Sequence, residues 1–209
     1  RNLNIFDIPK GGFDPATKNW EKLEISKATG SVSALESSVY PAHILYYGTS
    51  SGKVYKIENA HSIWAKQTEI TGAQMLVSVS GKTNPFVSSI DANPLNANEL
   101  LVSFSNYGIE SIFYSKDGGS SWTAVSGNLE DGTADGNGPS VRSVAIVVSP
   151  TDTTYYAGTS TGLYSTTKLN GSSTTWIQEA KDKIGTTVVS MIKARRDGFI
   201  AAATHGNGV

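Results

Sequence analysis

The sequence predicts an all-β fold built from repeated antiparallel hairpins, and three observations support this. Short apolar runs alternate with turns rich in Gly, Ser, Thr and Asn along the whole 209-residue chain. No segment shows the sustained 3.6-residue periodicity of an amphipathic helix. The pattern of strand, turn and strand also recurs along the chain, which indicates several copies of one structural unit.

One hairpin pattern occurs three times, and each copy ends in Tyr and is followed by a Trp. The copies span residues 45–55, 101–114 and 155–164. The Trp residues that follow are Trp64, Trp122 and Trp176, and each is expected to pack within its repeat. A β-rich run precedes each hairpin, at residues 31–39, 86–92 and 141–149. Each repeat therefore supplies four short strands.

Four-stranded units repeated at this interval are typical of a β-propeller, whose blades span roughly 40–50 residues. The expected blades cover residues 31–70, 86–129 and 141–180. The longer intervals between them are assigned to loops that connect the blades. The prediction is thus a propeller of four-stranded antiparallel blades, of which this chain supplies about four.

The two ends of the chain each match half of a blade. Residues 3–25 match the outer two strands, with Ile5-Phe6 and Trp20 on either side of a glycine turn, and residues 187–209 match the inner two. Either the halves join into a composite blade that closes a ring of four, or the chain belongs to a larger ring of about seven or eight blades. We favour the larger ring. Residues 1–209 are then a single propeller domain or a fragment of one, and the remaining blades of the parent polypeptide are its partners.

Composition excludes several classes of function. The 17 Lys and Arg residues nearly balance the 18 Asp and Glu residues, so no nucleic-acid partner is expected. The absence of Cys excludes disulfides and thiolate metal sites. No run approaches the roughly 18 apolar residues of a membrane helix, so the chain is not expected to be membrane-embedded.

Residues 114–122 carry the most distinctive motif, Tyr-Ser-Lys-Asp-Gly-Gly-Ser-Ser-Trp. Ser115, Asp117, Gly119 and Trp122 fit the pattern Ser-x-Asp-x-Gly-x-x-Trp, which looks like an Asp box. Asp117 is expected to accept backbone N–H bonds across the turn, the glycines permit positive φ, and Trp122 packs on neighbouring strands. We interpret the motif as a structural staple of its hairpin and not as a catalytic centre.

Together with the terminal segment Ala203–Val209, these repeats resemble the sortilin-like and xyloglucanase-like superfamily of Asp-box (BNR-like) propellers. The likeness is greatest to propeller domains of secreted proteins from Bacteroidetes-type bacteria that use type IX secretion. The resemblance implies a bacterial protein that is secreted or held on the outer cell surface. It is specific for fold and does not identify an activity.

Candidate sites are few. Asp131, Asp135 and Asn137 lie in the most polar loop and offer oxygen ligands for a structural Ca²⁺, and no other cofactor is expected. A glycoside hydrolase needs two carboxylates that flank the scissile bond. The sequence pairs none of the available carboxylates, which include Asp91, Glu99, Glu110, Asp131, Asp135 and Asp197. His43, His61 and His205 show no metal-ligand spacing.

The leading functional hypothesis is therefore a non-catalytic secreted or cell-surface module for binding, adhesion or assembly. Its ligand is expected to be a protein or a polysaccharide. Two alternatives stay open: a polysaccharide-active hydrolase similar to xyloglucanases, and an assembly factor for a larger complex.

Overall fold

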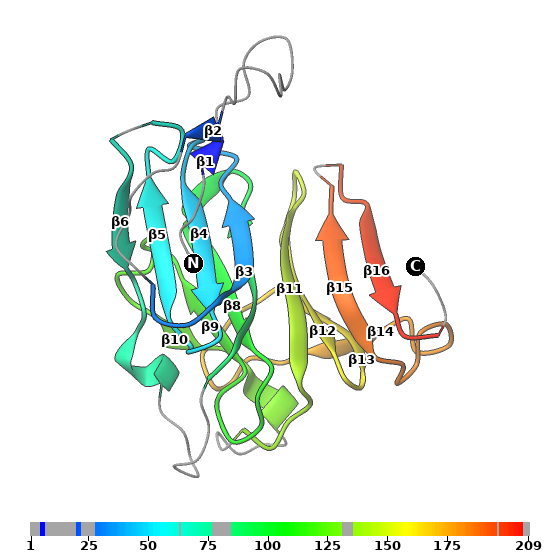
Figure 1. Cartoon of the computed structure of the whole chain (residues 1–209). Helices are drawn as coiled ribbons and strands as arrows, with labels where there is room; N and C mark the ends of the chain where they lie inside the picture. Colours follow the sequence, from blue (N-terminus) through cyan, green and yellow to red (C-terminus); the bar gives the residue numbers. More distant parts are fainter. Residues whose placement is uncertain are drawn as a thin grey trace.

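The computed structural model describes residues 5–6, 20–21, 28–62, 64–76, 85–130, 136–195 and 197–206. It confirms an all-β propeller architecture, with three four-stranded and two two-stranded antiparallel sheets (Figure 1). The helical segments among these residues are two short 3-10 turns, η1 (Ala73–Leu76) and η2 (Gly127–Glu130). No helix in this part of the chain has the length and apolar character needed to cross a membrane.

Each four-stranded sheet is a meander in which strand order follows chain order. The first blade comprises β3 (Val32–Ser37), β4 (Leu45–Thr49), β5 (Val54–Glu58) and β6 (Lys66–Glu69). The second comprises β7 (Val87–Asn93), β8 (Asn96–Phe104), β9 (Ile112–Ser115) and β10 (Thr123–Ala124). The third comprises β11 (Val141–Val148), β12 (Thr153–Thr159), β13 (Gly162–Thr166) and β14 (Ile177–Glu179).

The first strands of successive sheets line the inner side of the molecule. β7 packs against both β3 and β11, and β11 packs against β15 (Val189–Ala194). β15 pairs only with β16 (Ile200–Thr204) among the described strands, and this hairpin stands beside the third blade in Figure 1. We refer to β3, β7, β11 and β15 as the inner strands.

The hydrophobic core lies between the sheets. One buried cluster joins the first and second blades, and it includes Tyr46, Val54, Val87 and Phe104. A second cluster joins the second and third blades, and a third joins the third blade to the β15–β16 hairpin. The inner strand of the third blade, β11, carries a continuous apolar run from Val144 to Val148, and clusters on both sides of this blade cover it.

The two ends of the chain form separate sheets. β1 (Ile5–Phe6) pairs with β2 (Trp20–Glu21), and β15 pairs with β16. Within the described residues these two hairpins do not share a sheet. Figure 1 shows them well apart, with β1 and β2 beside the first blade.

Candidate functional site

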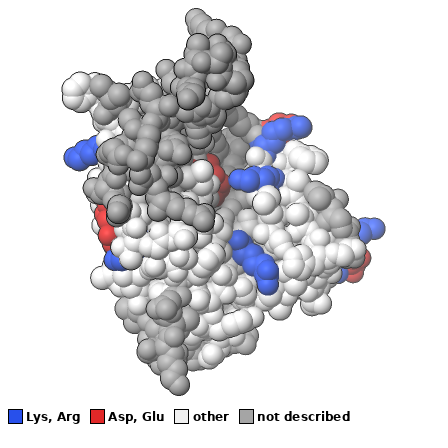
Figure 2. Space-filling view, in the orientation of Figure 1, with Lys and Arg blue, Asp and Glu red and all other residues white. Residues whose placement is uncertain are grey.

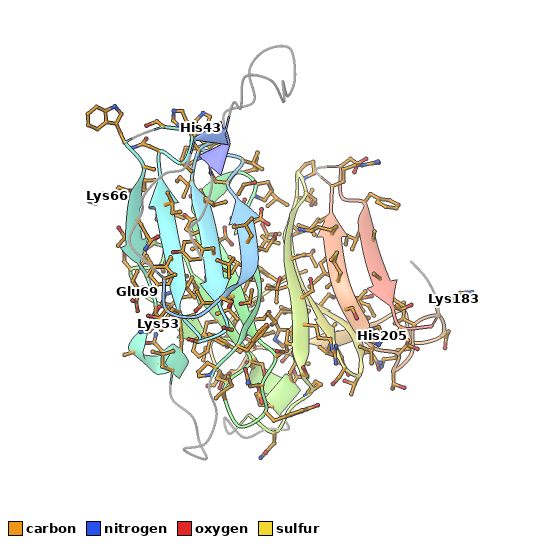
Figure 3. All side chains as sticks on the ribbon, in the orientation of Figure 1. His43, Lys53, Lys66, Glu69, Lys183 and His205 are labelled. Carbon is orange, nitrogen blue, oxygen red and sulfur yellow. The ribbon has the colours of Figure 1, made fainter. Side chains whose placement is uncertain are left out.

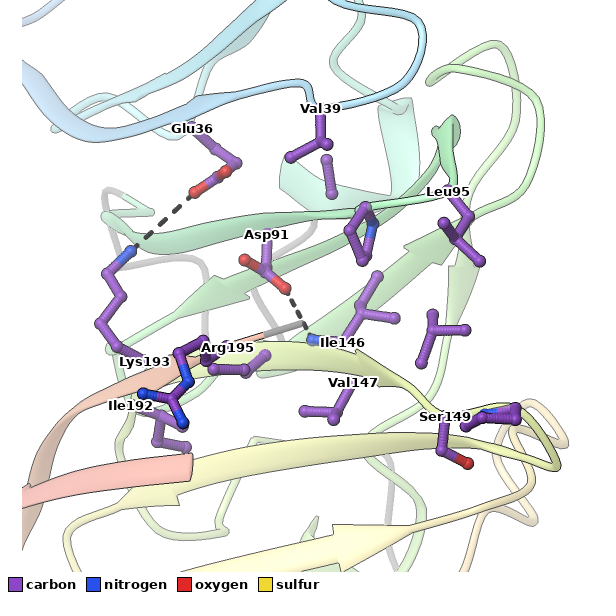
Figure 4. Close-up of a pocket in the computed structure, with 16 residues that line it drawn as sticks. Glu36, Val39, Asp91, Leu95, Ile146, Val147, Ser149, Ile192, Lys193 and Arg195 are labelled. Carbon is purple, nitrogen blue, oxygen red and sulfur yellow. Dashed lines mark hydrogen bonds and ion pairs between the residues drawn. The ribbon is translucent and has the colours of Figure 1, made fainter. Parts of the chain in front are cut away.

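A pocket of about 570 Å³ opens on the inner side of the molecule, where the four inner strands face one another. Its floor is aliphatic and includes Ala92 of β7, Ile146 and Val148 of β11 and Ile192 of β15. Figure 4 shows the labelled lining residues arranged around this space, with charged groups toward the side of β3 and β15. We call it the axial pocket.

Two carboxylates enter the axial pocket from neighbouring strands, β3 and β7. Asp91 accepts a hydrogen bond from the backbone amide of Ile146 at 2.6 Å, which ties β7 to β11. Burial is the main cause that raises the pKa of Asp91 to about 7, against the opposing effect of that amide. Burial also raises the pKa of Glu36, and the nearby ammonium of Lys193 opposes the rise. Glu36 and Asp91 therefore share one partly desolvated space (Figure 4).

Basic side chains surround the pocket. Lys193 Nζ lies 4.0 Å from Glu36 Oε2, and its side chain is 70% exposed. Arg195 pairs with Asp197 and lies over the ring of Phe199, with its guanidinium carbon 5.3 Å from the ring centre. Figure 2 shows Lys and Arg side chains in the middle of this face, between the first blade and β15–β16.

A smaller cavity of about 130 Å³ continues along the inner strands, and the exposed Arg142 borders it. Three basic side chains line the two cavities, those of Arg142, Lys193 and Arg195. The carboxylates of Glu36 and Asp91, whose pKa is raised, line them as well. Lys193 faces Glu36 and Arg195 pairs with Asp197, so the axial side presents charges of both signs, with Arg142 as a further basic group beside the smaller cavity.

The repeat explains why these groups converge. A register shift follows the first Val of every inner strand, at Val32/Ala34, Val87/Ser89, Val141/Ser143 and Val189/Met191. These bulges are equivalent, so residues at equal spacing beyond them face the same space. Glu36, Asp91, Ala145 and Lys193 occupy one such position, and all four line the axial pocket. Glu36 and Lys193 were missed at the sequence level, and aligning the inner strands on their first Val would have found them.

The turn expected to be an Asp box is held by hydrogen bonds around one carboxylate. Asp117 accepts from the amide of Ser121 at 2.8 Å and from the Ser121 hydroxyl. The Ser115 hydroxyl donates to Asp117 and accepts from the amide of Gly119 at 2.9 Å. These bonds, chiefly those from Ser121, lower the pKa of Asp117 to about 2. Gly118 and Gly119 have φ of 71° and 89°, where glycine is favoured.

Two of the repeat tryptophans link neighbouring blades. Trp122 is buried and its indole N–H donates to the carbonyl of Ile70 at 2.7 Å. Trp176 does the same to the carbonyl of Val125 at 2.8 Å. Trp64 is 78% exposed, so the expectation that every Trp packs within its repeat is wrong for this one. Unlike Trp122 and Trp176, which directly precede β10 and β14, Trp64 lies in the turn before β6.

The predicted calcium ligands are only partly described. Asp131 and Asp135 lie outside the described residues, and Asn137 is exposed. Elsewhere in the described ranges, no group of three or more His, Asp or Glu side chains is arranged to hold a metal ion.

The other expected carboxylates do not meet at one site. Glu99 accepts from the hydroxyls of Tyr114 and Tyr155 at 3.1 and 2.7 Å, between the second and third blades. Burial raises the pKa of Glu110, and Asp197 pairs with Arg195 on the surface.

The histidines separate into a pair and a single residue. The rings of His43 and His61 lie 4.0 Å apart, which their sequence spacing did not indicate. Figure 3 shows His43 and His205 on opposite sides of the molecule.

Comparison with known proteins shows the fold and does not assign a family. No protein-family model matches the chain, and no curated protein matches it. A GH74 enzyme from Niastella koreensis is similar in structure, with a TM-score of 0.51 and 17% identity over 83% of this chain. An enzyme described as an ancestral GH74 is also similar, with a TM-score of 0.52 and 20% identity over 88% of this chain. The chain spans about a quarter of each neighbour, 26% and 23% of their lengths, and the shared feature is the propeller architecture.

Proposed function

We propose that the chain is a non-catalytic binding module of a secreted or cell-surface bacterial protein. Its axial pocket would receive an acidic protein segment that carries an aliphatic side chain. The observation that carries this proposal is the chemistry of the pocket lining: an aliphatic floor, basic side chains at the edge and no aromatic residue among the lining residues. Sugars are commonly held by stacking on exposed aromatic rings, so this lining favours a peptide over a polysaccharide.

The carboxylates of the pocket already have partners that suit a structural role. Asp91 receives the Ile146 amide and so links two inner strands, while Glu36 faces Lys193. A catalytic pair must present free oxygens to the scissile bond or to a water molecule. These contacts therefore favour binding over hydrolysis.

One observation supports a second candidate, a polysaccharide hydrolase. Glu36 and Asp91 share the pocket, and an acid whose pKa is raised to about 7 is suited to protonate a leaving group. Two of the structural neighbours are GH74 enzymes. In this alternative Asp91 is the general acid and Glu36 the second carboxylate.

Calorimetry with end-blocked peptides distinguishes the candidates. A peptide of alternating Glu and Leu is expected to bind, and its Lys–Leu counterpart is not. Lys193→Glu is expected to lower the affinity for the acidic peptide about fivefold to tenfold, because it reverses one charge at the pocket edge. Lys183→Glu makes the same change on a distant exposed turn and serves as the control (Figure 3).

An unchanged affinity in Lys193→Glu would exclude the axial pocket as the binding site. The parallel assay measures reducing ends released from xyloglucan oligosaccharides. Release that is lost in Asp91→Asn would establish the hydrolase and overturn the binding proposal.

Two further expectations remain proposals. Secretion predicts a parent gene with a signal peptide and a C-terminal sorting domain, and a parent gene lacking both would exclude it. A Ca²⁺ held by Asp131, Asp135 and Asn137 predicts a lower melting temperature after chelation. An unchanged melting temperature in EDTA would exclude the ion.

A further inference from the structure

The smaller cavity beside the axial pocket has a polar lining, and we call it the inner cavity. Its volume is about 130 Å³, below the roughly 300–1,000 Å³ of sites that hold drug-sized ligands. A single small ion therefore fits it better than a peptide or a sugar. The polar residues that line it lie on the inner strands β7, β11 and β15 and include Ser89, Asp91, Arg142, Ser143, Ser190 and Lys193.

Three serine hydroxyls in this lining keep a hydrogen to donate. The Ser89 hydroxyl accepts from the amide of Val144 at 3.3 Å, and the Ser143 hydroxyl accepts from the amide of Ile192 at 3.0 Å. Each hydroxyl carries one hydrogen, and no described residue accepts it from either serine. Ser143 is only 6% exposed, and the hydroxyl oxygen of Ser190 is buried without a hydrogen-bond partner. These hydrogens need acceptors inside the cavity, which water or an anion can supply.

A guanidinium group at the inner cavity favours an anion over water. Arg142 directly follows the first Val of β11, at the position where β3, β7 and β15 all carry serine. It is exposed, lines the cavity and forms no ion pair with another described residue. A guanidinium binds oxyanions through two parallel N–H bonds. Together with the hydroxyl groups it makes the cavity rich in donors that suit a tetrahedral oxyanion.

One carboxylate among these donors makes the inner cavity selective. An Asp91 oxygen accepts from the Ile146 amide, and the other accepts no hydrogen bond from the described residues. Figure 4 shows this second oxygen turned away from Ile146 toward the side of Lys193. Since burial raises the pKa of Asp91 to about 7, the group is largely ionised at about pH 8. An ionised carboxylate repels an anion that cannot donate a hydrogen bond to it, as sulfate cannot, whereas hydrogen phosphate can.

We propose that the inner cavity binds one hydrogen phosphate ion. The serine hydroxyls and the guanidinium of Arg142 would donate to its oxygens, and its own P–OH group would donate to Asp91. The acidic peptide of the proposed function belongs to the axial pocket, so binding of this ion does not depend on it.

Calorimetry with sodium phosphate and sodium sulfate at about pH 8, without peptide, tests the proposal. Phosphate should bind about tenfold or more tightly than sulfate, because a hydrogen bond to Asp91 replaces a repulsion. Arg142→Gln should lower the phosphate affinity about tenfold or more, since it removes a charged pair of donors. Lys183→Gln also removes one positive charge, on a distant exposed turn (Figure 3), and should leave the affinity within about twofold.

Asp91→Asn separates selectivity from folding. Its amide can accept from phosphate and donate to sulfate, so the affinity for sulfate should rise about fivefold or more toward that for phosphate. A change that only perturbs the fold would move both affinities together, and circular dichroism checks that the variant is folded. Wild-type protein that binds no phosphate at millimolar concentration would show that the cavity holds water only and would overturn the proposal. Equal wild-type affinity for the two anions, or an unchanged phosphate affinity in Arg142→Gln, would overturn it as well.

Discussion

The contact between Gly48 and Val87 predicts a large effect from a single methyl group. In Gly48→Ala, the new Cβ would lie 2.2 Å from Val87 Cγ1 and 2.5 Å from Val87 Cβ, far inside van der Waals contact. Gly48 is not among the residues with positive φ, so backbone strain does not contribute. Val87 is fully buried, and its carbonyl is held by Ser33, so it has little freedom to move away. We expect a loss of about 1–3 kcal/mol in the free energy of unfolding, as for other overpacked cores.

A double-mutant cycle isolates the contact. Val87→Ala alone should cost about 2–3 kcal/mol, since it removes two buried methyl groups and leaves a cavity. It also removes the atom nearest to the new methyl group. Gly48→Ala/Val87→Ala should therefore be more stable than the sum of the single effects by at least about 1 kcal/mol.

Urea unfolding followed by circular dichroism measures each free energy. Thr68→Ala on the exposed strand β6 is the control and should stay within about 0.5 kcal/mol of the wild type. A Gly48→Ala protein as stable as this control would refute the close packing of the first two blades. Strict additivity in the cycle would show that Val87 is not the residue displaced.

Three further changes test individual side chains by urea or thermal unfolding. Burial raises the pKa of Asp91 to about 7, so as the pH rises Asp91 ionises in the unfolded chain before it ionises in the folded one. The wild type therefore loses stability between about pH 4 and pH 7. The free energy of unfolding of Asp91→Asn should rise relative to that of the wild type by up to about 4 kcal/mol over this range, with no further change above about pH 7. Hydrogen bonds, chiefly from Ser121, lower the pKa of Asp117 to about 2, so the ionised Asp117 stabilises the fold fully above about pH 4. The difference in melting temperature between the wild type and Asp117→Asn should therefore disappear as the pH falls from about 4 to about 2. Glu99→Ala leaves the hydroxyl of Tyr155 without its acceptor and should cost about 2–4 kcal/mol, and Glu99→Gln should recover part of this. A pH-independent gap for either aspartate, or a neutral Glu99→Ala, would contradict these assignments.

The repeat was visible in the sequence because each blade is specified by local patterns. Apolar strands ending at Asn93-Pro94 and Ser149-Pro150 identify the inner strands, and the structure ends β7 and β11 at Asn93 and Val148. The turn at Asp117 is also largely local, since the hydrogen bonds of the Asp117 carboxylate come from Ser115 and Ser121, although the amide of Gly118 donates to the carbonyl of Asn98 at 2.9 Å.

The axial pocket was not visible because it depends on packing between blades. Glu36 and Lys193 are far apart in the chain, and only the stacking of the inner strands brings them to 4.0 Å. The exposure of Trp64 has a different origin, because Trp122 and Trp176 directly precede the last strand of their blades whereas Trp64 lies in the turn before β6. Trp122 and Trp176 are buried, and their indole N–H groups reach the preceding blade.

Glu36, Asp91 and Lys193 occupy equivalent positions of the repeat and bring charges to the axial pocket. They differ in how much the stability of the fold depends on them. Asp91 both lines the pocket and accepts a hydrogen bond from the Ile146 amide, so a change there alters the pocket lining and the packing between blades together. Lys193 occupies the equivalent position but is largely exposed, and its ion pair with Glu36 is at the distance limit, so it contributes little to stability. The proposed peptide binding can therefore be tested at Lys193 without disturbing the contacts between blades, so that a loss of peptide affinity in Lys193→Glu would report on the pocket itself.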